Sequence, residues 1–212
     1  MKFVWARFAT LLAAFAMSAA AARTPSVRDT SHLAPDGSRV LEQSLEIAAP
    51  VRAVWNAFAT TEGWRAWGAP VANVDLRVGG VIESSYDPAV ALGSGATIRN
   101  RITAFVPERM LAFVNEQAPP RTAFDVPTFQ RLQTIIFFEP VGATRTRVTV
   151  TQAGYGQDRN FDGVYRFFRW GNAQTLEQLR RHLERGARSP SARTPQARRG
   201  AIERAGVGSE RR

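Results

Sequence analysis

The chain has 212 residues and no cysteine, which excludes disulfide bonds, thiol catalysis and lipid attachment through a cysteine. Its formal net charge of +10 arises largely at the two ends: residues 1–22 hold Lys2 and Arg7, and residues 186–212 hold seven Arg against two Glu. Because the basic tail has no aromatic side chain on which a base could stack, this charge does not indicate a nucleic-acid-binding protein.

Residues 1–22 have the layout of a secretory signal peptide. A basic start is followed by an apolar run over residues 8–17 and by alanines that offer A-x-A cleavage sites around Ala20 and Ala22. The run is shorter than the roughly 20 residues needed to cross a bilayer, and no later segment is free of charge over such a length. We therefore expect an exported protein, periplasmic or secreted, without a transmembrane segment. A retained signal anchor is the alternative.

The remaining chain is expected to hold one folded domain. Residues 23–38 are a polar lead, and residues 39–185 are long enough for one substantial core without an internal repeat or linker. Residues 186–212 are rich in Arg, Pro, Ser and Gly, which predicts a disordered tail. Weak contact of this tail with anionic envelope surfaces is the one partner that its charge suggests.

The domain is expected to begin with a strand and two short helices. Residues 39–47 alternate apolar and polar side chains, which predicts a half-buried strand. Residues 49–61 have apolar side chains at helical spacing and Pro50 in a first-turn position, which predicts a short helix. A second short helix carries Trp64 and Trp67, which share a face because they are three residues apart.

A run of strands and one long helix follow. Turn spacing predicts about six antiparallel strands in the following segments: residues 71–88, with Gly79-Gly80 as a tight connection, and residues 96–107, 109–116, 129–140 and 144–155. Residues 161–184 form an amphipathic helix. This order predicts an α+β fold in which a curved antiparallel sheet of about seven strands packs on the C-terminal helix. Because one helix cannot seal a strongly bent sheet everywhere, a cavity is expected at one end.

Several short segments together resemble a known superfamily. They are "EIAAPVRAVWNAFATTEGWRAWGAP", "DLRVGGVIE", "RITAFVPERMLAFV" and "TRVTVTQAGY". Their order and spacing are similar to the START-like superfamily, also called SRPBCC or Bet v 1-like, in the branch of activator-of-heat-shock-ATPase homologues. The resemblance spans residues 40–184, and Trp55, Trp67 and Gly79-Gly80 match positions typical of the branch.

The resemblance implies a helix-grip fold, in which the sheet wraps around the C-terminal helix and leaves an apolar cavity. It does not imply the activity in the branch's name, because relatives that stimulate a heat-shock ATPase act in the cytosol with an additional domain. The last helix also departs from the branch pattern at Trp170, Gly171 and Asn172. No residue of this helix is therefore assigned a role by resemblance alone.

The aromatic side chains around the expected cavity are the candidate ligand-binding residues. A ligand site needs a preformed apolar cavity and a few polar groups that orient the guest. The candidates for the wall are Trp67, Tyr86, Phe105, Phe113, Phe129, Phe138, Tyr155 and Phe168, with Asn100, Glu116 or Gln133 as polar contacts. We expect Trp67 near the cavity mouth and Trp64 packed behind it as its support.

The sequence offers little for metal or covalent chemistry. The two histidines, His32 and His182, have no ligand spacing, so we expect no metal and no cofactor. Residues 158–163, "DRNFDG", copy the opening of a calcium loop, but Arg169 stands at the twelfth position, where a bidentate carboxylate is needed. No nucleophile elbow or phosphate-binding glycine loop is present, and no catalytic residue is assigned.

Three carboxylates remain candidates for acid–base work: Glu83, Glu116 and Asp125. Burial in a cavity could raise the pKa of such a group into a useful range. The alternative is that they lie on the wet face of their strands and pair with arginines such as Arg99 or Arg101.

Three functions follow from these residues. The favoured one is an exported domain that binds a small hydrophobic or aromatic molecule without catalysis. The second is an enzyme similar to polyketide cyclases or aromatases, in which a cavity carboxylate or tyrosine moves protons. The third is a protein-interaction or cochaperone-like module that uses the outer sheet or the tail.

Overall fold

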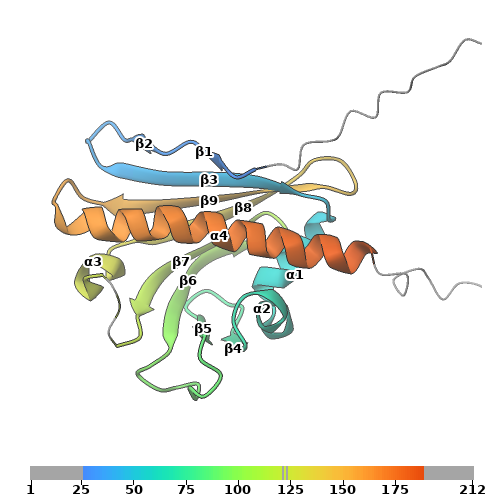
Figure 1. The fold of residues 1–212 in the computed structure, drawn as a ribbon, viewed down its shortest axis with the longest axis horizontal. Helices are drawn as coiled ribbons and strands as arrows, with labels where there is room; N and C mark the ends of the chain where they lie inside the picture. Colours follow the sequence, from blue (N-terminus) through green and yellow to red (C-terminus); the bar gives the residue numbers. More distant parts are fainter. Residues whose placement is uncertain (1–25, 121, 123, 189–212) are drawn as a thin grey trace, which may run out of the picture.

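The computed structural model describes residues 26–120, 122 and 124–188. The expected signal peptide and most of the expected tail lie outside these residues. Over the described part the chain forms an α+β fold, with one antiparallel sheet of nine strands and a long C-terminal helix (Figure 1). The predicted helix-grip fold is confirmed.

The sheet is built in the order β1-β3-β9-β8-β7-β6-β5-β4, and β2 pairs with β3 beside β1. The strands are β1 (Arg28–Asp29), β2 (His32–Leu33), β3 (Arg39–Ile47), β4 (Val71–Val74), β5 (Val81–Ser85), β6 (Ile98–Val106), β7 (Met110–Gln117), β8 (Gln133–Pro140) and β9 (Thr146–Tyr155). The predicted alternation is observed in β3 and β9, where every second side chain is buried.

The expected polar lead contributes the two shortest strands. Arg28 pairs with Ser44 and His32 with Val40, so β1 and β2 both lie along β3. The backbone N–H of Thr30 also donates to the carbonyl of Glu42 at 2.9 Å. Strands of two residues are too short to show an alternating pattern, which is why about seven strands were expected instead of nine. The folded region therefore begins before Arg39.

The helices are α1 (Val51–Ala59), α2 (Thr61–Trp67), α3 (Val126–Gln130) and α4 (Asn160–Arg188). Figure 1 shows α4 running along β3, β9 and β8, with α3 near one end of the sheet and α1 and α2 near the other. Within the described residues, no helix combines the length and the apolar character that a membrane span requires.

Helix α3 was not expected, because residues 129–140 were predicted to be one strand. Asp125 begins the helix as its N-cap and accepts hydrogen bonds from the backbone N–H and the hydroxyl of Thr128, at 2.9 and 2.7 Å. Pro127 in the first turn also favours a helix start. The strand β8 consequently begins only at Gln133.

Two groups of buried side chains hold α4 on the sheet. The larger core packs α1 and α2 against β3, β7, β8 and β9, and includes Leu176 and Leu179 of α4. The smaller core includes Leu41 and Tyr155 at one end of β3 and β9, with Phe161 and Val164 from the first turns of α4. The middle turns of α4 lie between these two anchored parts.

Candidate functional site

A cavity of about 480 Å³ lies between the middle turns of α4 and the sheet. Strands β5 to β9 contribute Ser84, Ile98, Asn100, Phe113, Asn115, Thr134, Ile136, Val150 and Gln152. Helix α4 contributes the residues Phe167, Phe168, Trp170, Gly171, Asn172, Gln174, Thr175, Leu176 and Gln178. The ends are closed by Phe58 and Trp64 on one side and by Phe124 and Phe129 on the other. This volume lies within the roughly 300–1,000 Å³ typical of small-molecule sites.

The sequence of α4 explains why the helix leaves a space there. Apolar residues occupy its buried face at Val164 and Phe168 and again at Leu176 and Leu179. Between them the same face carries Gly171, Asn172 and Thr175, which are small or polar. An ideal Cβ built on Gly171 would meet no atom within 4 Å. The helix therefore packs on the sheet at two places and spans the cavity between them.

The sheet wall carries a polar row that is largely satisfied within the protein. Gln152 donates to the hydroxyl of Thr134 at 3.0 Å and accepts a hydrogen bond from the phenol of Tyr155. Asn115 donates to the carbonyl of Phe129 at 3.2 Å. These bonds fix the side chains in place, so the wall is preorganised.

The mouth of the cavity carries exposed aromatic side chains. Tyr86 and Trp170 line the cavity although they are 68% and 67% exposed. Phe167 lines it as well and is 44% exposed. These rings come from the β5–β6 connection and from α4, so they frame the opening from two sides.

The two tryptophans of α2 have the opposite places from those expected. Trp67 is buried in the larger core, where its indole N–H donates to the carbonyl of Ala57 at 2.8 Å. Trp64 lines the cavity and stacks on Trp67, with ring centroids 5.3 Å apart. The expectation that Trp67 would lie at the cavity and Trp64 behind it is therefore corrected. Trp67 packs against α1, where its ring lies 5.1 Å from that of Phe58, whereas Trp64 borders the cavity.

Four of the other predicted wall residues line the cavity. They are Tyr86, Phe113, Phe129 and Phe168, and the polar candidate Asn100 joins them. The rings of Phe129 and Phe168 stack with centroids 5.9 Å apart, which connects α3 to α4 across one end of the cavity. Binding of a ligand by these residues remains a prediction.

Five predicted residues lie elsewhere. Phe138 packs under α1, 5.4 Å from the rings of both Trp55 and Phe58. Tyr155 is fully buried in the smaller core. Phe105 packs against the larger core because a bulge between Ile102 and Ala104 shifts the alternation of β6.

The remaining two, Glu116 and Gln133, are excluded from the cavity by strand alternation. Asn115 on β7 and Thr134 on β8 face the cavity. Their strand neighbours Glu116 and Gln133 therefore face outward. Glu116 forms an ion pair with Arg101 on that outer face, and Gln133 is exposed.

None of the three candidate carboxylates lines the cavity. Glu116 pairs with Arg101 and Asp125 caps α3, as described above. Glu83 is buried, but its Oε1 accepts hydrogen bonds from the backbone N–H of Gly93 and the hydroxyl of Thr97, both at 2.7 Å. Its other oxygen lies 3.5 Å from the guanidinium of Arg99. The alternative of pairing with arginines is therefore observed for Glu116 and Glu83, although Glu83 is buried, whereas Asp125 caps a helix instead.

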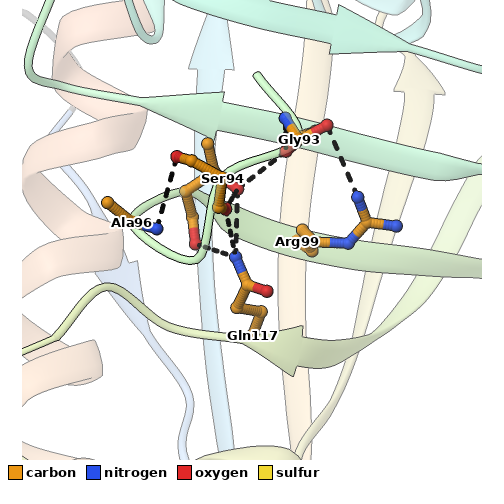
Figure 2. Close-up of polar contacts among 7 residues, drawn as sticks. Gly93, Ser94, Ala96, Arg99 and Gln117 are labelled. Carbon is orange, nitrogen blue, oxygen red and sulfur yellow. Dashed lines mark hydrogen bonds and ion pairs between the residues drawn. The ribbon is translucent and has the colours of Figure 1, made fainter. Parts of the chain in front are cut away.

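The contacts of Glu83 belong to a network that holds the β5–β6 connection on the sheet. Figure 2 shows the backbone of Gly93, Ser94 and Ala96 beside the side chains of Arg99 and Gln117. Gln117 on β7 donates to the carbonyl of Ser94 at 3.0 Å and to that of Thr97 at 2.9 Å. The buried carboxylate thus positions a segment that starts with Tyr86 at the cavity mouth.

The cavity is uncharged over its described lining, which contains no Asp, Glu, Lys, Arg or His. Tyrosine chemistry finds no support at Tyr155 either, because burial raises the pKa of its phenol far above its usual range. Tyr86 is the only titratable side chain in the described lining, so this lining offers hydrogen-bond donors and acceptors but neither a carboxylate nor an imidazole.

The segment that resembles a calcium loop takes a different structure. Helix α4 begins at Asn160, and Asp162 pairs with Arg39 of β3 at 2.7 Å. In the part of the chain that the structure describes, no cluster of three or more His, Cys, Asp or Glu could hold a metal ion.

Sequence reasoning missed Trp64, Asn172 and Gln178 among the wall residues. The signal for the last two was present: small and polar residues interrupt the apolar stripe of α4, and this departure from the branch pattern coincides with the cavity. The signal for Trp64 was absent, because spacing places both tryptophans on one face without saying which is deeper.

Comparison with known proteins gives a family and a set of similar folds. The family described as Activator of Hsp90 ATPase homolog 1-like protein matches residues 48–184. No curated protein matches the chain by sequence.

Three solved structures illustrate the likeness of fold. The Aha1 dimer from Colwellia psychrerythraea is 17% identical with a TM-score of 0.54, and the match covers 69% of this chain and 97% of that one. Protein MLL2253 from Mesorhizobium loti is 19% identical with a TM-score of 0.54, covering 69% and 98%. The di-domain ARO/CYC BexL from the BE-7585A biosynthetic pathway is 17% identical with a TM-score of 0.54, covering 71% of this chain and 48% of BexL. At these identities the likeness concerns the fold.

Proposed function

Because the chain belongs to the Activator of Hsp90 ATPase homolog 1-like protein family, in the START-like superfamily that its sequence resembles, we propose that it binds a small hydrophobic or aromatic molecule in the cavity under α4. The observation that carries this proposal is a preformed space of about 480 Å³ with aromatic walls and no charged side chain in its described lining. Apolar burial supplies the binding free energy, and the neutral polar groups orient the ligand.

Binding without catalysis fits this site better than the cyclase or aromatase alternative. The named candidate acids are engaged outside the cavity, with Arg99, with Arg101 and with the first turn of α3. The likeness to BexL, which is described as an ARO/CYC protein, is a likeness of fold. A general acid or base needs to reach the reacting group, and the described lining offers neither a carboxylate nor an imidazole.

The experiment is a fluorescence titration of the purified protein with N-phenyl-1-naphthylamine, a neutral apolar probe. We expect saturable binding that raises the emission of the probe. The variant Gly171→Leu places a side chain in the open space beside α4 and should weaken binding at least about tenfold, because it fills volume that the probe needs.

The matched control is Gly163→Leu. Gly163 lies on the same helix, is exposed and would also meet no atom with a Cβ, but it does not line the cavity. Both variants gain roughly 0.5–1 kcal/mol of helix propensity. Equal binding by the two variants and the unchanged protein would refute a ligand site in this cavity.

The place of action is part of the proposal. Residues 1–22 direct export, so the ligand would be met outside the cytoplasm. Fractionation of cells that express the chain with and without these residues tests this, and retention of the full chain in the cytoplasm would contradict it.

A further inference from the structure

The opening of the cavity is bordered by aromatic side chains that are largely in contact with solvent. Tyr86 follows directly after β5, and Phe167 and Trp170 lie on α4. All three line the cavity, and all three are exposed. Large apolar side chains that are exposed at one place mark a site of contact with an apolar partner or surface.

The outward face of α4 continues this surface and carries positive charge. Arg166 lies four residues before Trp170, and Arg181 and Arg185 lie eleven and fifteen residues after it, so helical spacing places all four side chains on one face. All four are exposed. Figure 1 shows α4 lying across the sheet, so that one side of the helix packs on the strands and the other faces away from them.

The acidic residues of α4 do not balance these three arginines. Within the described residues, the ion pairs of α4 are formed by Asp162, Arg169, Glu177 and Arg180. The third acidic residue of the helix, Glu184, accepts a hydrogen bond from the backbone just before α1. The outward face therefore has a net positive charge.

The charge lies along α4 and not at the opening itself. Asp87, which is exposed beside Tyr86, is the acidic residue nearest to the rings in the sequence. Residues 189–212, which follow α4, hold six Arg against two Glu. The helix thus carries aromatic rings near its middle and positive charge on both sides of them.

We propose that the aromatic opening and the outward face of α4 dock on a lipid bilayer that carries anionic headgroups. This inference goes beyond the proposed function, because it identifies a partner surface and not the ligand. Trp and Tyr rings are favoured at the boundary between headgroups and hydrocarbon. Arginines attract anionic lipids, and aromatic rings beside cationic side chains are typical of helices that lie in a membrane interface.

The position of the rings favours a bilayer over a protein partner. Phe167 and Trp170 border the cavity as well as the solvent. A protein docked there would close the opening, whereas rings inserted between headgroups place the opening against an apolar medium. An apolar molecule then passes between bilayer and cavity without being hydrated, which removes an unfavourable step.

The test is sedimentation of the protein with lipid vesicles. It uses residues 23–212, the exported form proposed above, which keeps every residue that the structure describes. The vesicles consist of phosphatidylcholine alone or of phosphatidylcholine with phosphatidylglycerol, which is anionic. We expect at least about tenfold tighter binding to the mixed vesicles at low salt, and a much smaller difference at about 0.5 M salt, because salt screens the attraction.

Two variants test the rings. Trp170→Ser and Phe167→Ser should each weaken binding to the mixed vesicles at least about fivefold, because each removes an apolar group from the contact. The matched control is Phe137→Ser: Phe137 is 45% exposed, against 44% for Phe167, but it lies on the outer face of β8. It should change binding by less than about twofold. Circular dichroism checks that each variant is folded.

One variant tests the charge. Arg166→Ala should weaken binding to the mixed vesicles about fivefold and leave binding to the neutral vesicles unchanged, since one arginine near an anionic surface contributes about that factor. The control with the same change of charge is Arg109→Ala, because Arg109 is exposed between β6 and β7 and is not part of α4. It should have an effect of less than about twofold.

Each other outcome overturns the inference. Equal weakening by these variants and their controls would show a non-specific attachment. Binding that no α4 variant weakens would place the contact in residues 189–212. No binding to either kind of vesicle would leave a protein as the partner of this face. The naphthylamine titration keeps the two proposals apart: uptake of the probe without vesicle binding overturns this inference alone, and vesicle binding without uptake overturns the proposed function alone.

Discussion

At the scale of single residues, the partner of the indole N–H separates two tryptophans that the sequence cannot separate. Trp67 is 5% exposed and its N–H is bound by the carbonyl of Ala57, whereas the N–H of Trp64 is unpaired among the described residues. Spacing predicts their shared face. Which of the two is deeper depends on α1 and on Gly68, and both come into place only in the folded chain.

Trp67→Phe should therefore lower the stability of the fold. It leaves the Ala57 carbonyl without this donor and reduces the volume of a well-packed side chain, so we expect the free energy of unfolding to fall by about 1–3 kcal/mol. Urea denaturation measures this. Trp64→Phe loses no internal hydrogen bond and should lower it by less. An equal loss in the two variants would show that both tryptophans act as ordinary core.

The positions of the candidate carboxylates can also be explained residue by residue. Glu116 was predicted as a cavity contact, but alternation along β7 puts it on the face away from Asn115, where it pairs with Arg101 of the neighbouring strand β6. The hydrogen bonds of Glu83 with Gly93 and Thr97 could not be predicted, because they depend on how a long connection folds back over β5. Periodicity describes a strand and says little about a connection.

At the scale of elements, α4 was the best predicted part and its middle was the least understood. Expected over residues 161–184, it spans Asn160–Arg188, and its anchoring residues Leu176 and Leu179 are buried. At Gly171 and Asn172 the sequence departs from the family pattern, but the sequence alone does not say why. In the folded chain these residues line the cavity between α4 and the sheet.

A tie between α4 and β1 makes part of the stability depend on pH. The carboxylate of Asp29 accepts hydrogen bonds from Arg169 at 2.8 Å and from Gln43 at 3.3 Å. Burial acts to raise the pKa of Asp29, but hydrogen bonds from Ser31, Arg169 and Gln43 outweigh it and hold the pKa well below its usual range.

Because the folded pKa is the lower one, the stabilisation is present above the unfolded pKa of about 3.9 and is lost as the pH falls toward the folded value. Because Asp29 is exposed and solvent screens its contacts, we expect Asp29→Asn to lower the free energy of unfolding by about 0.5–1 kcal/mol at pH 7, with a smaller difference at pH 3. Urea denaturation at both pH values measures it. The exposed Asp158→Asn should show little change, and a constant difference for Asp29→Asn across the range would contradict this origin.

At the scale of the whole molecule, the order of the long strands along the chain, the helix-grip architecture and the presence of a cavity follow from periodicity and from the family resemblance. The short elements do not. Strands β1 and β2 owe their existence to pairing with β3, and α3 depends on capping by Asp125 within a segment that otherwise favours a strand. Tertiary contacts decide such cases because local propensity is weak over so few residues.

The arrangement of two cores around the cavity explains how the fold can keep an open space. Leu176 and Leu179 anchor one part of α4, while Phe161 and Val164 anchor another. Packing stabilises the helix at both anchors, and the turns between them span the cavity. Leu176 belongs both to an anchor and to the cavity lining, so the cavity borders directly on the larger core.

The pairing of β3 with β9 has a kinetic consequence. Leu45 pairs with Val148, so the strand near the start of the domain meets its main neighbour only after almost the whole domain has been synthesised. Closing so long a loop is entropically unfavourable until the intervening elements are in place, and refolding in milliseconds to seconds is the expected result. Stopped-flow refolding monitored by tryptophan fluorescence measures this rate, and a microsecond phase that recovers the full signal would contradict the prediction.

Strands β1 and β2 offer β3 a local partner on its other edge. Until β9 is in place, β1 and β2 would protect this outer edge of β3 from pairing with a wrong strand.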